Sequence, residues 1–443
     1  MSDLLPQRRF STHIAWTFGT RILMLLSGVG ASVIVAHMLG AEGLGALAVL
    51  NVTVAVALQL GSAGLPSANT YFIARDKSSV ARVCANALVF ALVAGCAFAL
   101  VVVALARFYP ALFGHVPVGL MTVAAVSIPF QLITLLGLNV FLGLNRIGHF
   151  NLLDAAAQAL LLVNALVALV ILGAGLRALV SLNTLVSVLM SLLIVWMIAR
   201  LLKELRGQKF RPDAKLFRHM ARYGLKFHVA VVAALLIFRA DLLIVNHFRG
   251  ATEAGVYAVA TQVATMLMLL PGVIGTLLLP RVASAPDARG EMTMRVTRHT
   301  AFVMLFVCLA AVPASFALPF VYGAQFADAS WQLLILLPGI YLVGIESVLV
   351  QHFSSLGLPV AIPLFWLATL CLNVALNLAF VPTYGARAAA VASSISYALI
   401  FILVATYFRA RTGNSLSTTL FLRAGEMREL LATARARGRF ASR

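Results

Sequence analysis

The chain has 443 residues, of which 62% are hydrophobic and only 11% charged, and its mean hydropathy is +1.00. Soluble domains contain about 45–50% apolar residues, so this composition excludes an ordinary soluble protein and indicates a membrane protein. The formal net charge of +19 is compatible with a nucleic-acid ligand unless the basic residues have another explanation. Their placement along the chain provides one.

Twelve apolar runs are long enough to cross a bilayer, which takes about 20 residues in a helix. Lipid offers no hydrogen-bond partners to an open backbone, so helices are the structure that suits such runs. The runs lie at 14–38, 44–72, 80–106, 116–144, 151–173, 177–202, 224–247, 255–280, 298–321, 330–353, 359–382 and 386–408. We therefore predict an all-α membrane protein of about twelve transmembrane helices in two six-helix lobes. Glycine and proline at 61–66 and at 271–272 predict a bend in the second helix of each lobe.

A repeat 210 residues apart supports the two lobes. Residues 34–49 (IVAHMLGAEGLGALAV) and 244–259 (IVNHFRGATEAGVYAV) are identical at eight of sixteen positions, and 175–178 (GLRA) matches 385–388 (GARA) at the same offset. Each lobe has an even number of helices, so both enter the membrane in the same orientation. We expect a pseudo-twofold axis along the membrane normal, as in transporters built from parallel repeats.

Basic residues are concentrated on one side of the predicted helices. The outer turns hold only four of them, Arg107, Arg177, Arg249 and Arg387. Apart from Arg21 and Arg239 within the apolar runs, the inner segments hold the others, at 8–9, 75–82, 146, 200–226, 281–298 and 409–443. This is the positive-inside pattern, and it predicts that both termini are cytoplasmic. Topology thus accounts for the charge, and we expect no nucleic-acid partner.

The predicted domains are an N-terminal lobe (1–202), a cytoplasmic linker (203–223), a C-terminal lobe (224–409) and a basic tail (410–443). The linker is the longest polar interruption, and Pro212 breaks any continuous helix through it. The tail suits either an amphipathic helix on an anionic leaflet or a disordered segment.

Two arginines within the apolar runs are the leading candidates for substrate contact, because an ionisable group inside a membrane helix is costly. Arg21 lies in the first helix, and Arg239 lies deeper, in the seventh. A guanidinium binds phosphate bidentately, so phosphate is the leading ligand class. The structural alternative is that each arginine pairs with a carboxylate on a neighbouring helix, or that Arg21 extends to the interface.

Four further residues are candidates. His228 and Asn246 share a face of the seventh helix with Arg239, since separations of 11 and 7 are near whole turns. Asp241 points to another surface, where it serves either the structure or the binding of a coupling ion. Glu346, deep in the tenth helix, is the second carboxylate with these two possible roles.

Other polar residues give weaker signals. His37 and His247 occupy equivalent positions and suit capping of backbone carbonyls better than binding of sugar hydroxyls. Asn51 and Gln262 are among the amides that could line a wet interior, although such residues also join helices. The four cysteines lack metal-binding or disulfide spacing, and no phosphate-loop motif is present. We expect no cofactor and no metal.

Three segments resemble the oligosaccharide and polysaccharide flippases, of the O-antigen translocase type, within the multidrug/oligosaccharidyl-lipid/polysaccharide exporter superfamily. They are 36–45 (AHMLGAEGLG), 239–257 (RADLLIVNHFRGATEAGVY) and 373–389 (NVALNLAFVPTYGARAA). The resemblance covers essentially the whole chain. It implies a V-shaped pair of lobes that moves a polyprenyl-pyrophosphate-linked glycan for O-antigen, lipopolysaccharide or other polysaccharide biosynthesis across a bacterial inner membrane.

In such relatives cationic cavity residues are thought to meet the pyrophosphate, which maps onto Arg21 and Arg239. The expected partners are the lipid-linked glycan, the bilayer and other glycan-assembly membrane proteins.

Three alternatives remain. A drug/cation antiporter on the same fold would need a buried carboxylate in its path, and inward arginines would repel cations. A lipid II translocase usually has more helices than the twelve predicted. A glycan polymerase or ligase would need a large outer loop, which this sequence lacks, so we expect a transporter and not an enzyme.

Overall fold

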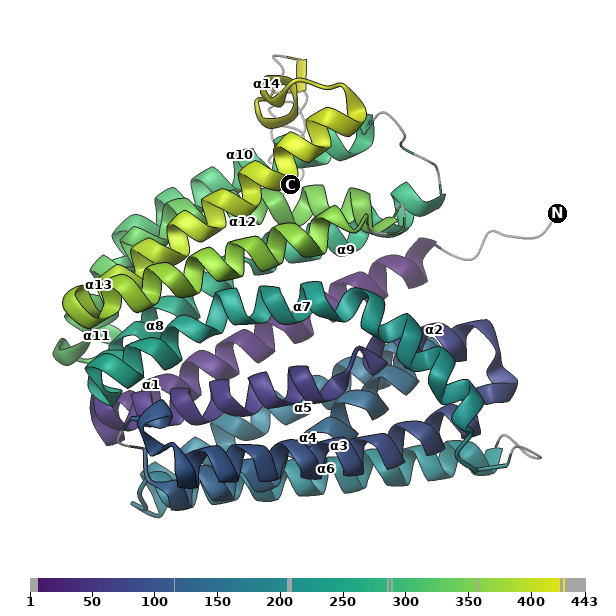
Figure 1. Cartoon of the computed structure of the whole chain (residues 1–443), viewed down its shortest axis with the longest axis horizontal. Helices are drawn as coiled ribbons and strands as arrows, with labels where there is room; N and C mark the ends of the chain where they lie inside the picture. Colours follow the sequence, from purple (N-terminus) through teal and green to yellow (C-terminus); the bar gives the residue numbers. More distant parts are fainter. Residues whose placement is uncertain are drawn as a thin grey trace, which may run out of the picture.

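A computed structural model describes residues 7–114, 116–204, 209–284, 287, 290–355, 357, 359–422 and 425–426. These residues form helices and turns without any strand. Figure 1 shows one bundle built from the first half of the chain, a second built from the last part, and α7 running between them.

The described part of the first half contains six α-helices, a π-helical turn at Leu166–Ile171 that extends α5, and short 3-10 turns at Lys77–Ser79 and Pro110–Phe113. The helices are α1 (Gln7–Ser62), α2 (Leu65–Arg75), α3 (Val80–Phe108), α4 (Val118–Gly143), α5 (Ile147–Ala165) and α6 (Leu176–Glu204).

The second half has a matching order. It contains α7 (Ala214–Arg249), α8 (Ala251–Leu267), α9 (Leu269–Ser284), α10 (Glu291–Ser315), α11 (Leu318–Tyr322), α12 (Ala327–Ser355), α13 (Ala361–Thr412) and α14 (Leu416–Leu420), with a 3-10 turn at Ala324–Phe326.

Ten helices of the described chain are long and apolar enough to cross a membrane. Two of them, of 44 and 52 residues, are about twice the length that a bilayer requires. Each contains one glycine with a left-handed φ, Gly40 at 69° and Gly385 at 66°. Figure 1 shows the chain reversing direction within both α1 and α13. Dividing these helices at the glycines yields twelve segments, but that count of twelve stays a prediction.

The predicted bends in the second helix of each half are confirmed. Ala63 and Gly64, both with positive φ, separate α1 from α2, and Pro66 stands in the first turn of α2. In the second half, α8 ends before Met268 and α9 follows directly.

Reciprocal contacts reveal the pseudo-twofold axis. A Cβ atom on Gly45 would lie 1.8 Å from the carbonyl oxygen of Ala251, and one on Gly255 would lie 2.0 Å from that of Ala41. Gly45 and Gly255 are equivalent positions of the repeat, and so are Ala41 and Ala251. The two backbones therefore touch at a point where only glycine fits, at the end of the molecule that carries the Gly40 turn.

The repeated histidines show the same symmetry. The His37 Nε2 lies 2.9 Å from the carbonyl oxygen of Val321, and the His247 Nδ1 lies 2.5 Å from that of Ala111. Val321 is 210 residues after Ala111, so each histidine contacts the turn before the fourth long helix of the opposite half. Both imidazoles thus cap backbone carbonyls, as the sequence favoured.

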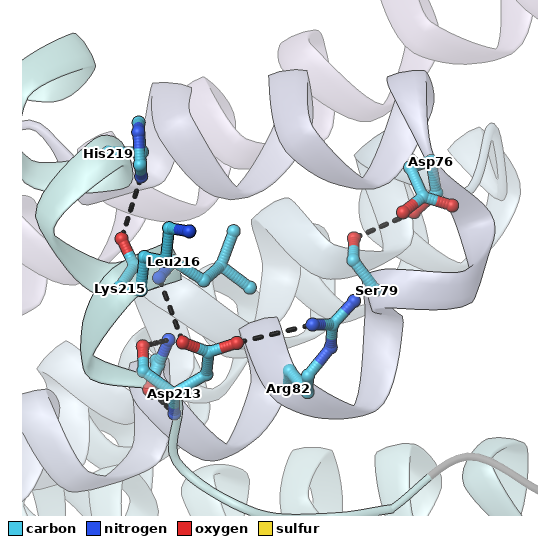
Figure 2. A network of polar contacts seen from close by, with 8 residues as sticks. Asp76, Ser79, Arg82, Asp213, Lys215, Leu216 and His219 are labelled. Carbon is cyan, nitrogen blue, oxygen red and sulfur yellow. Dashed lines mark hydrogen bonds and ion pairs between the residues drawn. The ribbon is translucent and has the colours of Figure 1, made fainter.

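The junction between the halves is attached to the first bundle (Figure 2). Asp213 caps the start of α7 by accepting a hydrogen bond from the Leu216 N–H at 3.0 Å, and Arg82 of α3 donates to its other oxygen at 3.2 Å. The Asn86 amide also exchanges two hydrogen bonds with the Asp213 backbone. Because this cap starts a helix, α7 begins at Ala214, within the segment predicted as linker.

These contacts stabilise the ionised Asp213 carboxylate. The hydrogen bond from Leu216 and the neighbouring Arg82 together lower the pKa of Asp213 from its ordinary value.

The first part of the basic tail is docked on the second bundle. Arg298 of α10 is 4% exposed, donates to both carboxylate oxygens of Glu426, and donates to the Thr418 carbonyl at 2.6 Å. The Thr418 contact holds the short helix α14 against α10, and the bidentate pair holds Glu426 there as well. Residues 427–443, which include the rest of the predicted amphipathic segment, lie outside the described residues.

Candidate functional site: a cavity between the two halves

A cavity of about 480 Å³ lies between the two halves, a size typical of small-ligand pockets. The first half contributes residues of α1, α5 and α6, and the second contributes residues of α7 and α8. Its polar or charged lining residues are Ser32, Asn51, Gln158, Asn183, Arg239, Thr261 and Gln262. Since both halves supply walls, relative movement of the halves changes this cavity directly.

Arg239 is the charged residue of the cavity lining, and its side chain is half-buried. It makes no hydrogen bond or ion pair with any residue that the structure describes, although its charge acts on Asp241 through space. A desolvated guanidinium without a carboxylate partner is costly. The cavity therefore presents a positive charge with free donors, which suits an anionic ligand.

Asp241 is not available to neutralise Arg239 by direct contact. It is 1% exposed and accepts hydrogen bonds from the Tyr257 hydroxyl at 2.5 Å and the Ser393 hydroxyl at 2.9 Å. Its other oxygen accepts from the Leu242 N–H at 2.8 Å. These contacts join α7, α8 and α13, and they favour the structural role over the binding of a coupling ion.

Arg21 has the partner that the structural alternative anticipated. Its Nη1 lies 3.2 Å from the Asp154 carboxylate of α5, and both side chains are partly exposed. Arg21 is not among the residues that line the central cavity, whereas Asp154 lines a second cavity inside the first half. The two arginines are therefore not brought together into one cavity, and a substrate role for Arg21 stays a prediction.

His228 and Asn246 lie near opposite ends of the membrane-crossing part of α7, and neither lines the central cavity. His228 is 9% exposed and interacts with the backbone of Leu60, where α1 approaches its break. Asn246 is fully buried, and its side-chain amide lies close to Gly114, at the turn that His247 also contacts. Substrate binding by these two residues stays a prediction, and their positions suit helix packing.

Glu346 is buried within α12 at 1% exposure, and its Oε1 has no hydrogen-bond partner among the described residues. It does not line the central cavity. Whether this carboxyl couples transport to an ion or serves packing stays open, because neither role is tested by its position. The described residues contain no group of three or more His, Cys, Asp or Glu side chains that could hold a metal ion.

The second cavity, of about 410 Å³, lies within the first half and shares lining residues with the central one. Sequence reasoning singled out Asn51 there but missed Gln131, Gln158 and Asn183. Each is a lone amide in an apolar run, and one such residue is a weak signal. Only the fold shows that amides from four helices face one space.

Comparison with known proteins agrees with this geometry. The family model described as polysaccharide biosynthesis protein matches residues 34–331. A probable low-salt glycan biosynthesis flippase, Agl15 of Haloferax volcanii, is 22% identical over 224 residues, which are 48% of this chain and 46% of that protein. The match thus spans about half of the relative's length.

Solved transporter structures share the fold. The inward closed conformation of the lipid II flippase MurJ superposes with a TM-score of 0.73 at 16% identity, covering 90% of this chain and 87% of that one. The inward-facing conformation of a multidrug resistance MATE family transporter of the MOP superfamily gives 0.71 at 15% identity, covering 90% and 98%. At these identities the likeness concerns the fold alone.

Proposed function

The chain belongs to the polysaccharide biosynthesis protein family, and from that membership we propose that it flips a polyprenyl-pyrophosphate-linked oligosaccharide across the bacterial inner membrane. The protein is a multi-pass membrane protein with a transporter fold. In the proposal it acts by alternating access, without covalent chemistry, and both termini are cytoplasmic because the basic residues gather on that side.

The observation that carries the proposal is the uncompensated Arg239 in the cavity between the halves. A pyrophosphate has several anionic oxygens that can accept the forked donors of a guanidinium. The N–H donors of Arg239 replace part of the hydration that a phosphate group loses on entering a membrane protein. A positive cavity also repels cationic drugs, which argues against the antiporter alternative.

Alternating access requires that the cavity open to one side at a time. In the proposal, the close Gly45–Gly255 contact closes the outer end of the cavity. In the proposed cycle this contact separates to release the glycan, while the cytoplasmic ends of the halves approach each other.

The test is transport by the purified full chain in liposomes. We would compare a polyprenyl pyrophosphate that carries an oligosaccharide with a fluorescent cationic dye, for wild type, Arg239→Gln, Arg21→Gln and Arg177→Gln. Arg177 is exposed on the surface at the start of α6, so its substitution is a control for the lost charge.

We expect Arg239→Gln to slow glycolipid transport by about tenfold or more, since hydrogen bonds to charged groups contribute about 1.5–3 kcal/mol, and Arg177→Gln to leave it unchanged. Arg21→Gln leaves Asp154 without its partner and should lower transport less, together with stability. Dye transport without glycolipid transport would refute the proposal in favour of the antiporter. Full glycolipid transport by Arg239→Gln would instead refute the role given to Arg239.

A further inference from the structure

The cavity inside the first half has a different chemistry from the central one. Four helices each direct an amide into it: Asn51 from α1, Gln131 from α4, Gln158 from α5 and Asn183 from α6. Its one lining carboxylate, Asp154, is neutralised by Arg21. The space therefore offers neutral donors and acceptors beside a cavity that offers a cation.

These amides have unused hydrogen-bonding capacity. The side chains of Asn51 and Gln158 make no hydrogen bond with any residue in the described part of the chain. Asn164 donates to the Asn183 Oδ1 at 2.9 Å, which orients this amide and leaves its Nδ2 free to donate. Gln131 donates to Ser127 at 2.8 Å and keeps its oxygen free. Asn183 thus meets an amide of a neighbouring helix, as amides that join helices do, whereas Asn51, Gln131 and Gln158 meet no other amide among the described residues.

The duplicated fold supplies an internal comparison. Asn51 corresponds to Thr261, whose hydroxyl donates to the Tyr257 carbonyl of its own helix at 3.1 Å. Asn183 corresponds to Ser393, which donates to Asp241. Ser187, another lining residue, corresponds to Tyr397, which is 4% exposed. At these positions the described second half is filled and hydrogen-bonded, whereas the first half leaves the equivalent space open.

We propose that the amide-lined cavity formed by Asn51, Gln131, Gln158 and Asn183 binds the neutral sugars of the glycan while Arg239 binds its pyrophosphate. This inference rests on the proposed function. A sugar hydroxyl donates and accepts at one atom, and a side-chain amide does the same across two atoms, so the two are matched without any charge.

The connection between the cavities fits this arrangement. Asn51, Gln158 and Asn183 line both cavities, so they lie where the first sugars would follow the pyrophosphate. Each cavity has the volume of a small-ligand pocket, about 410 and 480 Å³. The glycan would then reach into the first half, and the lipid-bound end would stay between the halves.

The experiment compares two lipids in liposomes with the full chain. One probe is a polyprenyl pyrophosphate that carries a neutral tetrasaccharide, scored by a glycosidase added outside. The other is the same lipid without sugar, scored by an added phosphatase. The variants are Gln131→Met, Ser187→Ala and their combination, because both residues line the amide cavity and not the central one. Gln59→Met is the matched control, because Gln59 is a partly buried glutamine of α1 that lines neither cavity.

Each lost hydrogen bond to sugar should slow transport of the tetrasaccharide lipid by about three- to tenfold, with a larger loss in the double variant. Transport of the sugar-free lipid should change by less than about twofold, and Gln59→Met should affect neither lipid. If a variant is not monodisperse in detergent, Gln131→Leu replaces it.

Equal losses for both lipids, or wild-type transport of the tetrasaccharide lipid by the double variant, would overturn the sugar site and leave the flippase function standing. Failure of the wild-type protein to move either lipid would instead overturn the proposed function, and the sugar site with it.

Discussion

Substitution of Gly45 by alanine should weaken the closure of the two halves at the end that carries the Gly40 turn. The added Cβ would lie 1.8 Å from the Ala251 carbonyl oxygen and must move to about 3.4 Å for an ordinary contact, an opening of roughly 1.6 Å. The atoms that this Cβ would meet belong to the backbone, so no side chain can rotate away to relieve the contact. Overpacking of this kind costs about 1–3 kcal/mol, which lowers the closed population about five- to 150-fold relative to the open one.

The helical preference of alanine over glycine acts in both conformations and does not offset this loss. Gly255→Ala should act alike, because its Cβ would lie 2.0 Å from the Ala41 carbonyl oxygen. The double variant should cost less than the sum of the two single variants, since one opening relieves both contacts.

The assay is the distance between spin labels at Glu42 and Thr252, two exposed positions on the facing turns, in a protein whose native cysteines are replaced by serine. Gly45→Ala should move the distribution to longer distances and slow transport. The control is Gly175→Ala, where an added Cβ meets nothing within 4 Å. An unchanged distance distribution in Gly45→Ala would refute the view that this glycine contact closes the cavity.

Three further predictions concern contacts outside the cavity. Asp241→Ala should lower the free energy of unfolding by about 3 kcal/mol or more, because it leaves buried donors unpaired, whereas Tyr257→Phe removes one hydrogen bond and should cost about 1 kcal/mol; chemical denaturation in detergent measures both, and equal costs would contradict the network. The lowered pKa of Asp213 means that its contribution to stability is complete above the ordinary carboxyl pKa of about 3.9 and is lost as the pH falls through the lower folded value. Thermal unfolding of wild type and Asp213→Asn should therefore differ at pH 6 and converge toward pH 3, and a constant difference would refute this. Arg298→Gln removes the ion pair with Glu426 and should release the docked tail from α10, so limited proteolysis should cut within 413–426 faster than in wild type; equal rates would show that the buried pair does not hold the tail.

Much of the fold could be predicted from the sequence because a bilayer constrains helices by length and polarity. The turns could be predicted where the backbone requires a glycine, as at Gly40 and Gly385, whose positive φ few other residues adopt. The start of α7 could not be predicted in this way. Polar residues after Pro212 suggest a linker. Hydropathy indicates which segments lie in the membrane, but it does not show whether a polar segment is helical, and Asp213 caps a helix that starts in this polar segment.

The charged part of the site was easier to predict than its geometry. Arg239 is conspicuous because the cost of a charge in lipid makes each one exceptional. The partner of Arg21 is 133 residues away in Asp154, and helical periodicity shows which face a residue occupies but not which helix it meets. The amides of the first half were missed for the same reason, since their meaning comes from convergence across four helices.

The duplication explains how the two halves can share a symmetric contact and yet have different roles in ligand binding. Where the copies agree, at Gly45 and Gly255, they form a symmetric contact that can open and close as one unit. Where they differ, Asp241 of the second half accepts hydrogen bonds from Tyr257 and Ser393, which joins α7, α8 and α13. The first half leaves equivalent space open, so a ligand bound there and at Arg239 contacts both bodies at once. Such a ligand can favour one arrangement of the halves over the other, which is the thermodynamic requirement for coupling binding to alternating access.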